Sequence, residues 1–329
     1  MSSYGLKINN PDGTSFIFNE NTTIPKMMGS GYYGGGTAAK TIATGIYIPE
    51  GYNFYLWVNP GGWIDYKVSG SQWTPTGAFY HHGVLDGNRQ VIIQSSWSQV
   101  LANWWAVFAY PVATKGSYGL SLNGNGSAMF RISDVSTFTK VAWKGDITIS
   151  SGWKPSSIGN FDFNTTMIFF YTTDINISVC KDGPSQSYKL YKNGGGEYSG
   201  SITVKMVVFS NGIMNRGKYG LRIYSPQNGS LVYDSSNQIL VNPQLVTFPQ
   251  ALYSLISVPS ISRPMYLPSS IGGFFSNQYM VDVAVVSNGY QVAAGWGTGN
   301  KQSASHGGNI LSISPNAVIC IDAQDYFNF

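Results

Sequence analysis

The sequence predicts an all-β protein built from three tandem antiparallel β-sandwich-like modules. Short runs rich in β-branched and aromatic residues recur between Gly, Pro, Asn and Ser along the chain, and helical periodicity is nearly absent. The single exception is residues 249–258, where a short helix is expected. In addition, the tripeptide Tyr-Gly-Leu occurs three times at nearly even spacing. Closely spaced strands in segments of about 100 residues are typical of small sandwiches or barrels.

Each copy of the tripeptide begins a predicted β-hairpin. The three copies read YGLKINNPDGTSFIFN, YGLSLNGNGSAMFRIS and YGLRIYSPQNGSLVYD. Apolar residues two positions apart fall on one face of a strand, and the polar stretch with Gly, Asn or Pro that follows predicts the turn. The leucine of each copy is therefore expected in a core, and the glycine at a bend or close approach of the chain. The equivalent repeat positions, with a predicted structural role, are Tyr4, Gly5, Leu6, Tyr118, Gly119, Leu120, Tyr219, Gly220 and Leu221.

The module boundaries follow from a second landmark. The same Val-Phe pair precedes the second and third copies at equal distance, and the residues between pair and tripeptide are small or polar. Such residues are typical of exposed links between modules. The predicted modules therefore span residues 1–116, which are rich in tryptophan, 117–217 and 218–329.

The composition predicts a polar but weakly charged surface. Aromatic residues make up 15% of the chain and charged residues 10%, whereas about 25% charged residues is usual. Such a surface suits permanent assembly into a larger object, or contact with neutral polar ligands such as sugars. The net charge of +4 comes from 19 basic and 15 acidic residues that are scattered along the chain. Because no Lys/Arg cluster exists, nucleic acid is not expected as a partner.

The two cysteines and the chain start bear on the cellular setting. Cys180 and Cys320 each lie in an apolar run, which predicts two small buried hydrophobic residues, with a mutual disulfide as the alternative. The first residues lack the basic and apolar regions of a signal peptide, and no apolar run is long enough for a membrane span. The sequence thus predicts synthesis in a cytoplasm and no membrane span.

The chain offers few residues for catalysis or metal binding. The three glutamates lie in loop-like sequence, and no aspartate has a recognisable catalytic setting. His81, His82 and Asp86 form the densest polar group. Adjacent strand residues face opposite ways, so the two histidines are not expected to chelate one ion, and a surface loop is predicted instead. No enzymatic activity, catalytic residue, metal or cofactor is predicted.

Two tryptophans of the first module are the best candidates for ligand contact, whereas most of the others are expected in the core or in a subunit interface. Trp104 and Trp105 are neighbours, so on a strand their rings face opposite ways and one must leave the module core to find another partner. Trp63 and Trp73 lie in stretches rich in Gly, Pro and Ser, and are expected to form an exposed aromatic platform. The predicted receptor- or ligand-binding residues are Trp63, Trp73, His81, His82 and Asp86.

The repeated pattern resembles the short hairpin of tail and tail-tip proteins of long-tailed bacteriophages. The copy YGLRIYSPQNGSLVYDSS is the nearest, YGLKINNPDGTSFIFNENTT is nearly as good, and the middle copy departs with Ser121 where a base usually stands. The resemblance covers about 20 residues per copy. It implies a non-enzymatic structural component of a tail tip or tail fibre, located in the virion tail and made in the host cytoplasm.

The resemblance also implies partners. Other tail proteins and copies of the chain itself are expected, the latter as a homotrimer, because low charge, exposed sheet edges and surplus aromatic residues need covering. One end would attach to the tail, and the other would bind a host surface glycan or protein as receptor. The alternative function is a free-standing, lectin-like carbohydrate-binding β protein. A lectin should be soluble and monodisperse when expressed alone, whereas a virion component should oligomerise or depend on a partner.

Overall fold

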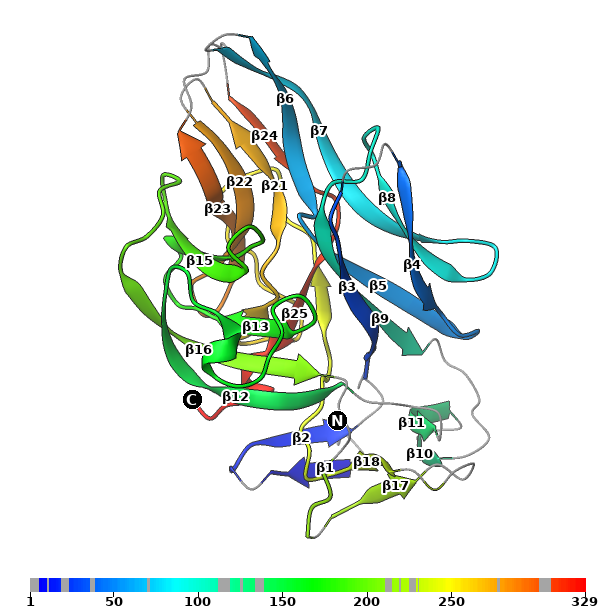
Figure 1. The fold of residues 1–329 in the computed structure, drawn as a ribbon. Coiled ribbons are helices and arrows are strands. Elements are labelled where there is room, and N and C mark those ends of the chain that lie inside the picture. The colour runs from blue at the N-terminus through cyan, green and yellow to red at the C-terminus, as the bar shows by residue number, and fades with distance from the viewer. Residues whose placement is uncertain are drawn as a thin grey trace.

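The protein is all-β, as predicted (Figure 1). The computed structural model describes residues 6–10, 12–18, 24–35, 39–69, 72–111, 119–124, 127–133, 139–210, 215–218, 220–224, 229, 231–276, 279–301 and 309–329. Within these ranges the chain forms strands and two single 3-10 turns, at Pro155–Ser157 and Ala323–Asp325, and no α-helix. No described helix is therefore long and apolar enough to cross a membrane.

Each of the three repeats folds as a two-stranded antiparallel hairpin, which confirms the prediction from the tripeptide pattern. The hairpin strands are β1 (Leu6–Asn9) with β2 (Ser15–Phe18), β10 (Gly119–Gly124) with β11 (Ser127–Ser133), and β17 (Arg222–Tyr224) with β18 (Leu231–Asp234). The first two share a register, since Leu6 pairs with Phe18 and Leu120 with Ile132. In the third, Ile223 pairs with Tyr233, a shift of two residues from the aligned pattern.

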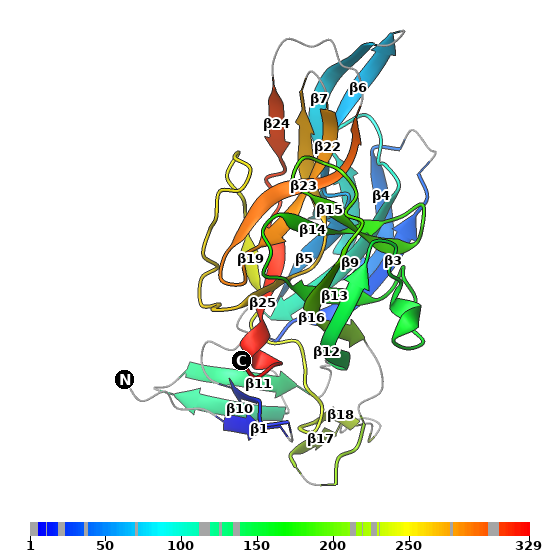
Figure 2. The same ribbon diagram turned by 90° about the vertical axis from the view of Figure 1, so that its left-hand side faces the viewer.

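The three hairpins lie together at one end of the molecule, at the bottom of both views (Figures 1 and 2). We call this region the hairpin end. The remaining strands form a single larger body above it. The repeats are thus brought together in space although they are far apart in the sequence.

One large sheet of the body has six strands, in the order β12-β16-β13-β20-β25-β19. These strands are β12 (Lys140–Ser150), β16 (Ser201–Ser210), β13 (Met167–Tyr171), β20 (Pro264–Tyr266), β25 (Val318–Asp322) and β19 (Gln244–Val246). Three of these strands, β12, β13 and β16, come from the predicted second module. The other three come from the predicted third module.

The other large sheet runs β23-β22-β21-β6-β7-β8-β4, with β24 also paired to β21. Its strands are β23 (Val292–Lys301), β22 (Tyr279–Ser287), β21 (Ser270–Phe275), β6 (Gly62–Ser69), β7 (Gln72–Leu85), β8 (Gln90–Ser95), β4 (Thr41–Tyr47) and β24 (Ile310–Ile313). Ile271 of β21 pairs in parallel with Gly62 of β6. Strands of the predicted first and third modules therefore share this sheet.

Two smaller sheets complete the body. A three-stranded sheet has the order β3-β9-β5, and β14 pairs with β15. These strands are β3 (Lys26–Tyr33), β9 (Asn103–Pro111), β5 (Tyr52–Asn59), β14 (Ile177–Asp182) and β15 (Ser187–Lys192).

The three-module count is not confirmed by this topology. Each of the two large sheets takes strands from two predicted modules, so the described segments do not form three self-contained sandwiches. The physical reason is that an open sheet edge is costly to leave bare, and here strands from a distant segment cover it. The boundary near residue 116 lies outside the described residues.

Residues 249–258 do not form the expected helix. This segment is irregular, with a φ of 57° at Tyr253, and it makes isolated bridges from Leu252 to Ala294 and from Ile256 to Val292, both in β23. The apolar residues of the segment thus pack along a strand, and this tertiary contact overrides a weak local helix signal.

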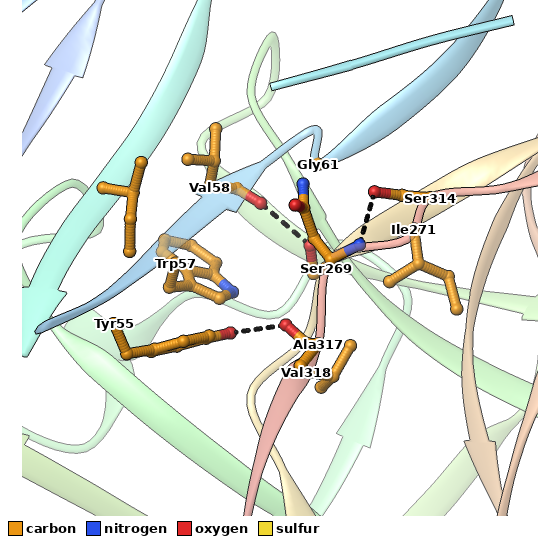
Figure 3. A pocket seen from close by; sticks show the side chains of 11 residues that line it. Tyr55, Trp57, Val58, Gly61, Ser269, Ile271, Ser314, Ala317 and Val318 are labelled. Carbon is orange, nitrogen blue, oxygen red and sulfur yellow. Dashed lines mark hydrogen bonds between the residues drawn. The ribbon is translucent and has the colours of Figure 1, made fainter. Parts of the chain in front are cut away.

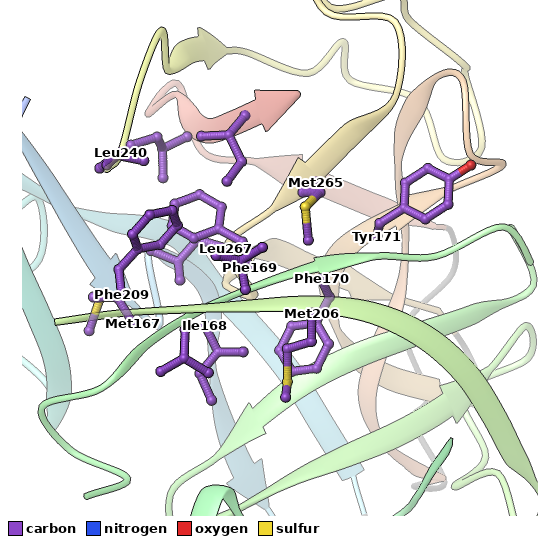
Figure 4. Packing of buried hydrophobic residues seen from close by; sticks show 14 of the residues in the cluster. Met167, Ile168, Phe169, Phe170, Tyr171, Met206, Phe209, Leu240, Met265 and Leu267 are labelled. Atoms are coloured by element: carbon purple, nitrogen blue, oxygen red, sulfur yellow. The ribbon is translucent and has the colours of Figure 1, made fainter. Parts of the chain in front are cut away.

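The largest core lies against the six-stranded sheet (Figure 4). Strand β13 is buried over its whole length, as expected for a continuous apolar run with both faces covered. Phe169 of β13 and Phe209 of β16 meet edge to face, with ring centroids 5.5 Å apart. Cys180 and Cys320 are buried and free, which confirms the prediction of two buried thiols.

The hairpin end is anchored to this core. Ile8 of the first hairpin and Tyr233 of the third are buried in the same hydrophobic cluster as β13. Polar contacts add to this attachment: Lys144 pairs with Asp12, and Gln238 Nε2 donates a hydrogen bond to Thr14 Oγ1 at 2.8 Å. The first and third hairpins are therefore packed on the body rather than free of it.

The predicted roles of the repeat residues are met only in part. Gly220 has φ +131°, and a Cβ there would collide with Ser235 Oγ, so the predicted need for glycine is confirmed at this copy. Leu221, however, is 36% exposed, so its predicted core position is wrong. The shifted register of the third hairpin accompanies this difference. Tyr4, Gly5, Tyr118 and Tyr219 lie outside the described residues, as do the side chains of Leu6 and Leu120 and the surroundings of Gly119.

We therefore expect a small effect from replacing Leu221 with alanine. The free energy of unfolding should fall by less than about 1 kcal/mol, because the side chain already keeps much of its contact with water. Tyr233→Ala in the same hairpin should cost several times more, because Tyr233 is fully buried. Urea unfolding of both variants measures the difference, and equal losses would contradict the exposed position of Leu221.

Candidate ligand-binding pocket

Trp63 is buried in β6 and does not form the exposed platform expected for it. Its side chain is 8% exposed, and its ring centroid lies 6.2 Å from that of Phe79 and 4.7 Å from that of His81. Pairing of β6 with β7 on one side and β21 on the other encloses this part of the strand. Trp73 lies in β7, and its side chain is outside the described residues.

His81 and His82 lie in β7, so the predicted surface loop is wrong at these positions. Their side chains do take opposite faces, as adjacent strand residues should: His81 is fully buried and His82 half-buried. His81 Nδ1 lies 2.8 Å from the Pro60 carbonyl oxygen, and Nε2 accepts from the Leu101 N–H at 3.2 Å. Burial lowers the pKa of His81 to about 4, so its imidazole is a neutral structural group.

Asp86 has a local role in the turn between β7 and β8. Its Oδ1 accepts hydrogen bonds from the backbone N–H groups of Asn88 at 2.9 Å and Gln90 at 2.7 Å. This arrangement is typical of an aspartate that closes a turn. Within the described ranges, no three His, Cys, Asp or Glu side chains are grouped as they would be to hold a metal.

The structure contains a pocket that sequence reasoning did not predict. A cavity of about 400 Å³ lies among the ends of β3, β5 and β9, the β14–β15 turn and strands β21 to β23. This volume is within the range of about 300–1,000 Å³ usual for small-molecule sites. The side chains that give it its chemistry are Tyr32, Asn59, Trp104, Asp182, Asp282 and Thr298.

One wall of the pocket is aromatic. The rings of Tyr32 and Trp104 lie 4.7 Å apart with 30° between their planes, and Tyr32 is 50% exposed whereas Trp104 is buried. Trp104 Nε1 donates to Asn164 Oδ1 at 2.7 Å, which fixes the indole. The turn residue Gly183 packs so closely that a Cβ there would collide with the indole ring. The exposed Tyr32 ring therefore rests on a rigid support.

Trp105 confirms the prediction that the two neighbouring tryptophans face opposite ways. It packs against a separate apolar cluster that includes Ile48 and Val91, whereas Trp104 belongs to the largest core. The outward ring of the pair is thus that of Trp105. Its partner is the sheet of the same body that contains β8.

The pocket lining also carries hydrogen-bond acceptors. Thr298 of β23 donates from Oγ1 to the carboxylate of Asp282 in β22. Burial raises the pKa of Asp282 to about 6, and this hydrogen bond opposes the shift. Asp182 at the end of β14 accepts from the Ser185 N–H at 3.1 Å and lies 3.6 Å from Lys189 Nζ.

Lys181 is buried behind the aromatic wall. Its Nζ lies 5.4 Å, 5.9 Å and 4.6 Å from the ring centroids of Trp57, Trp104 and Phe163. Nζ has no hydrogen-bond partner among the described residues, and cation–π contact with these rings is its main stabilisation. Burial lowers the pKa of Lys181 to about 7, and the charge of Asp162 opposes the shift.

A second cavity nearby is too small for an organic ligand. It has about 20 Å³, enough for a water molecule, and lies between β5 and the segments around Ser269 and Ala317 (Figure 3). Tyr55 OH donates to the Ala317 carbonyl oxygen at 2.9 Å, and Ser269 Oγ donates to that of Val58 at 3.0 Å. The larger pocket is therefore the candidate functional site.

Sequence reasoning did not predict this pocket, although two of its residues carry a signal. Lys181 ends the apolar run NISVCK, and Asp282 lies inside the apolar run YMVDVAVV. A charge in such a run is rarely placed without a partner or a function. Tyr32 carries no comparable signal, because only its exposure beside Trp104 distinguishes it.

Comparison with known proteins identifies the family but no function. The model of a family of unknown function (DUF6453) matches residues 5–305, so the chain belongs to that family. No curated protein and no solved structure matches the chain.

Proposed function

We propose that this member of the family is a non-enzymatic structural component of a bacteriophage tail tip or tail fibre. In this proposal the chain is located in the virion tail, assembles with other tail proteins and with copies of itself as a homotrimer, and contacts the host surface. The observation that carries the proposal is the gathering of three hairpins, each with a phage-like repeat, at one end of the molecule (Figure 2).

The hairpin end is suited to attachment. Each described hairpin is a two-stranded sheet, so its strands have backbone N–H and C=O groups on the outer edge available to another chain. Extended segments of partner proteins pair with such edges through main-chain hydrogen bonds. The edges of three hairpins at one end offer a single multivalent attachment surface, and the body that carries the pocket is left for contact with the host.

The lectin-like alternative stays a second candidate because of the pocket. A pocket lined by an exposed tyrosine and two carboxylates suits a sugar whether or not the chain is part of a particle. The two functions differ in location and assembly. A tail component is found in virions and oligomerises, whereas a lectin needs neither a virion nor an oligomer in order to bind sugar.

The test is to locate the chain in purified phage particles by immunoelectron microscopy and to measure its mass in solution by analytical ultracentrifugation. We expect label at the tail end and a trimer. The variant Tyr32→Ala is the control, since a change in the pocket should leave incorporation intact. A monomer that is absent from particles would overturn the proposal in favour of the lectin.

A further inference from the structure

We propose that the pocket beside Tyr32 is a binding site for an uncharged sugar, with Tyr32 as the stacking surface and Asp282 as an acceptor for sugar hydroxyls. This inference deepens the proposed host contact and rests on it for its biological role. The pocket geometry does not depend on that role.

Tyr32 has the placement of a stacking residue. A tyrosine ring that is 50% exposed at the mouth of a pocket leaves apolar surface open to water, and covering that surface is favourable. Trp104 supports the ring from behind, and both Asn164 and Gly183 hold Trp104 in place. A sugar presents a face of C–H groups that fits such a flat, rigid ring.

The charges around the pocket favour a neutral ligand over an acidic one. The described lining residues include two carboxylates, Asp182 and Asp282, and a single basic residue, Lys181. The amine of Lys181 is buried among three rings, so it is not offered to a ligand. Lys189, which lies beside Asp182, is already engaged by that carboxylate at 3.6 Å. An acidic sugar would therefore meet repulsion without a compensating cation.

A cationic ligand is also disfavoured. Aromatic rings and carboxylates can bind quaternary ammonium groups, but the ring of Trp104 already interacts with the amine of Lys181. Lys181 precedes Asp182 on β14. In its charged form its buried amine repels a second cation at the same ring. Sugar hydroxyls, by contrast, are neutral donors that match the acceptors on the polar wall.

The polar wall is preorganised for such donors. Asp282 and Thr298 are held on neighbouring strands β22 and β23 and hydrogen-bonded to each other. Asn59 is a buried lining residue and is fixed in place, because its Nδ2 donates to the Lys181 carbonyl oxygen at 3.2 Å and its Oδ1 accepts from the Ser270 N–H at 2.7 Å. Fixed acceptors lose little entropy on binding.

The experiment measures binding to the purified full chain by saturation-transfer NMR and titration calorimetry. The probes are the methyl glycosides of glucose, galactose, mannose and N-acetylglucosamine, with methyl glucuronide and choline as charged comparisons. We expect at least one neutral glycoside to bind, and the charged probes to bind at least tenfold more weakly. No binding of any neutral probe, or tighter binding of glucuronide or choline, overturns the inference.

Matched variants locate the site. Tyr32→Ala should weaken binding about tenfold, and Tyr47→Ala, which removes an equally exposed tyrosine from β4, should leave binding unchanged. Gly183→Ala should weaken binding by displacing Trp104, whereas Gly87→Ala is the control, since a Cβ at Gly87 meets nothing. Thermal unfolding of each variant separates a changed site from a misfolded chain. Equal affinity of the Tyr32 and Tyr47 variants contradicts the placement.

The role of Asp282 has a readout in pH. The groups that face it are Cys180 and Asp182 from β14, Tyr191 from β15 and Thr298 from β23. Sugar affinity should fall as pH is lowered from 7.5 to 5, because protonation removes an acceptor, and Asp282→Asn should abolish this pH dependence. An unchanged pH profile in Asp282→Asn rules out the assigned role. Because binding is measured without particles, its failure leaves the tail proposal standing, and binding by a chain absent from virions favours the lectin.

Discussion

Replacing Phe209 with alanine is expected to lower the free energy of unfolding by about 3–5 kcal/mol. Phe209 is buried in β16 and meets Phe169 and Tyr326 edge to face, at centroid distances of 5.5 Å and 5.6 Å. Alanine would leave a cavity between the six-stranded sheet and the C-terminal turn, and it would remove both ring contacts. Urea unfolding followed by tryptophan fluorescence measures the loss.

Two comparisons make this result specific to packing. Phe209→Leu keeps most of the volume and should cost clearly less than the alanine variant. Tyr47→Ala removes an exposed ring and should stay within about 0.5 kcal/mol of the wild type. A loss below about 1 kcal/mol for Phe209→Ala would mean that this core does not hold the body together.

The second large effect is expected from Asp234→Ala, at about 3 kcal/mol. Asp234 is fully buried at the end of β18 and accepts hydrogen bonds from Arg222 Nε at 2.8 Å, the Ser236 N–H at 2.9 Å and the Gly217 N–H at 3.1 Å. Alanine would leave these donors without their acceptor inside the third hairpin. Asp234→Asn retains the shape and part of the hydrogen bonding, and should cost less.

Asp234 also predicts a dependence of stability on pH. Burial raises the pKa of Asp234, but hydrogen bonds from Ser236, Arg222 and Gly217 outweigh burial and lower it to about 2. An unfolded aspartate titrates near pH 3.9, so this contribution to stability is complete above about pH 4 and is lost as pH falls toward 2. Between pH 4 and 2, the free energy of unfolding of Asp234→Ala should fall by less than that of the wild type. Parallel losses would show that Asp234 is not held as a carboxylate.

Features that depend on residues adjacent in the sequence could be predicted from the sequence. Alternation with a period of two predicts strands, so the all-β class, the three hairpins and the opposite faces of Trp104 and Trp105 follow from local pattern. Burial of Cys180 and Cys320 follows in the same way from their apolar surroundings.

The exposure of individual side chains was harder to predict from the sequence. Trp63 lies among Gly and Pro residues that are typical of loops, yet pairing with two other strands buries it. Leu221 occupies an apolar repeat position, yet the register of its hairpin leaves it exposed. In both cases the partner strand, and not the local sequence, decides which side of the chain is covered.

The class of structure, the repeated hairpins and the low charge of this protein follow from its amino-acid sequence alone. The long-range fold brings the hairpins to one end, joins distant segments in shared sheets, and places Tyr32, Trp104, Lys181 and Asp282 around one pocket. Backbone hydrogen bonds are alike along every strand, so local pattern cannot specify which strands pair. That choice depends on which arrangement buries the most apolar surface and covers the sheet edges, and this is a property of the whole chain.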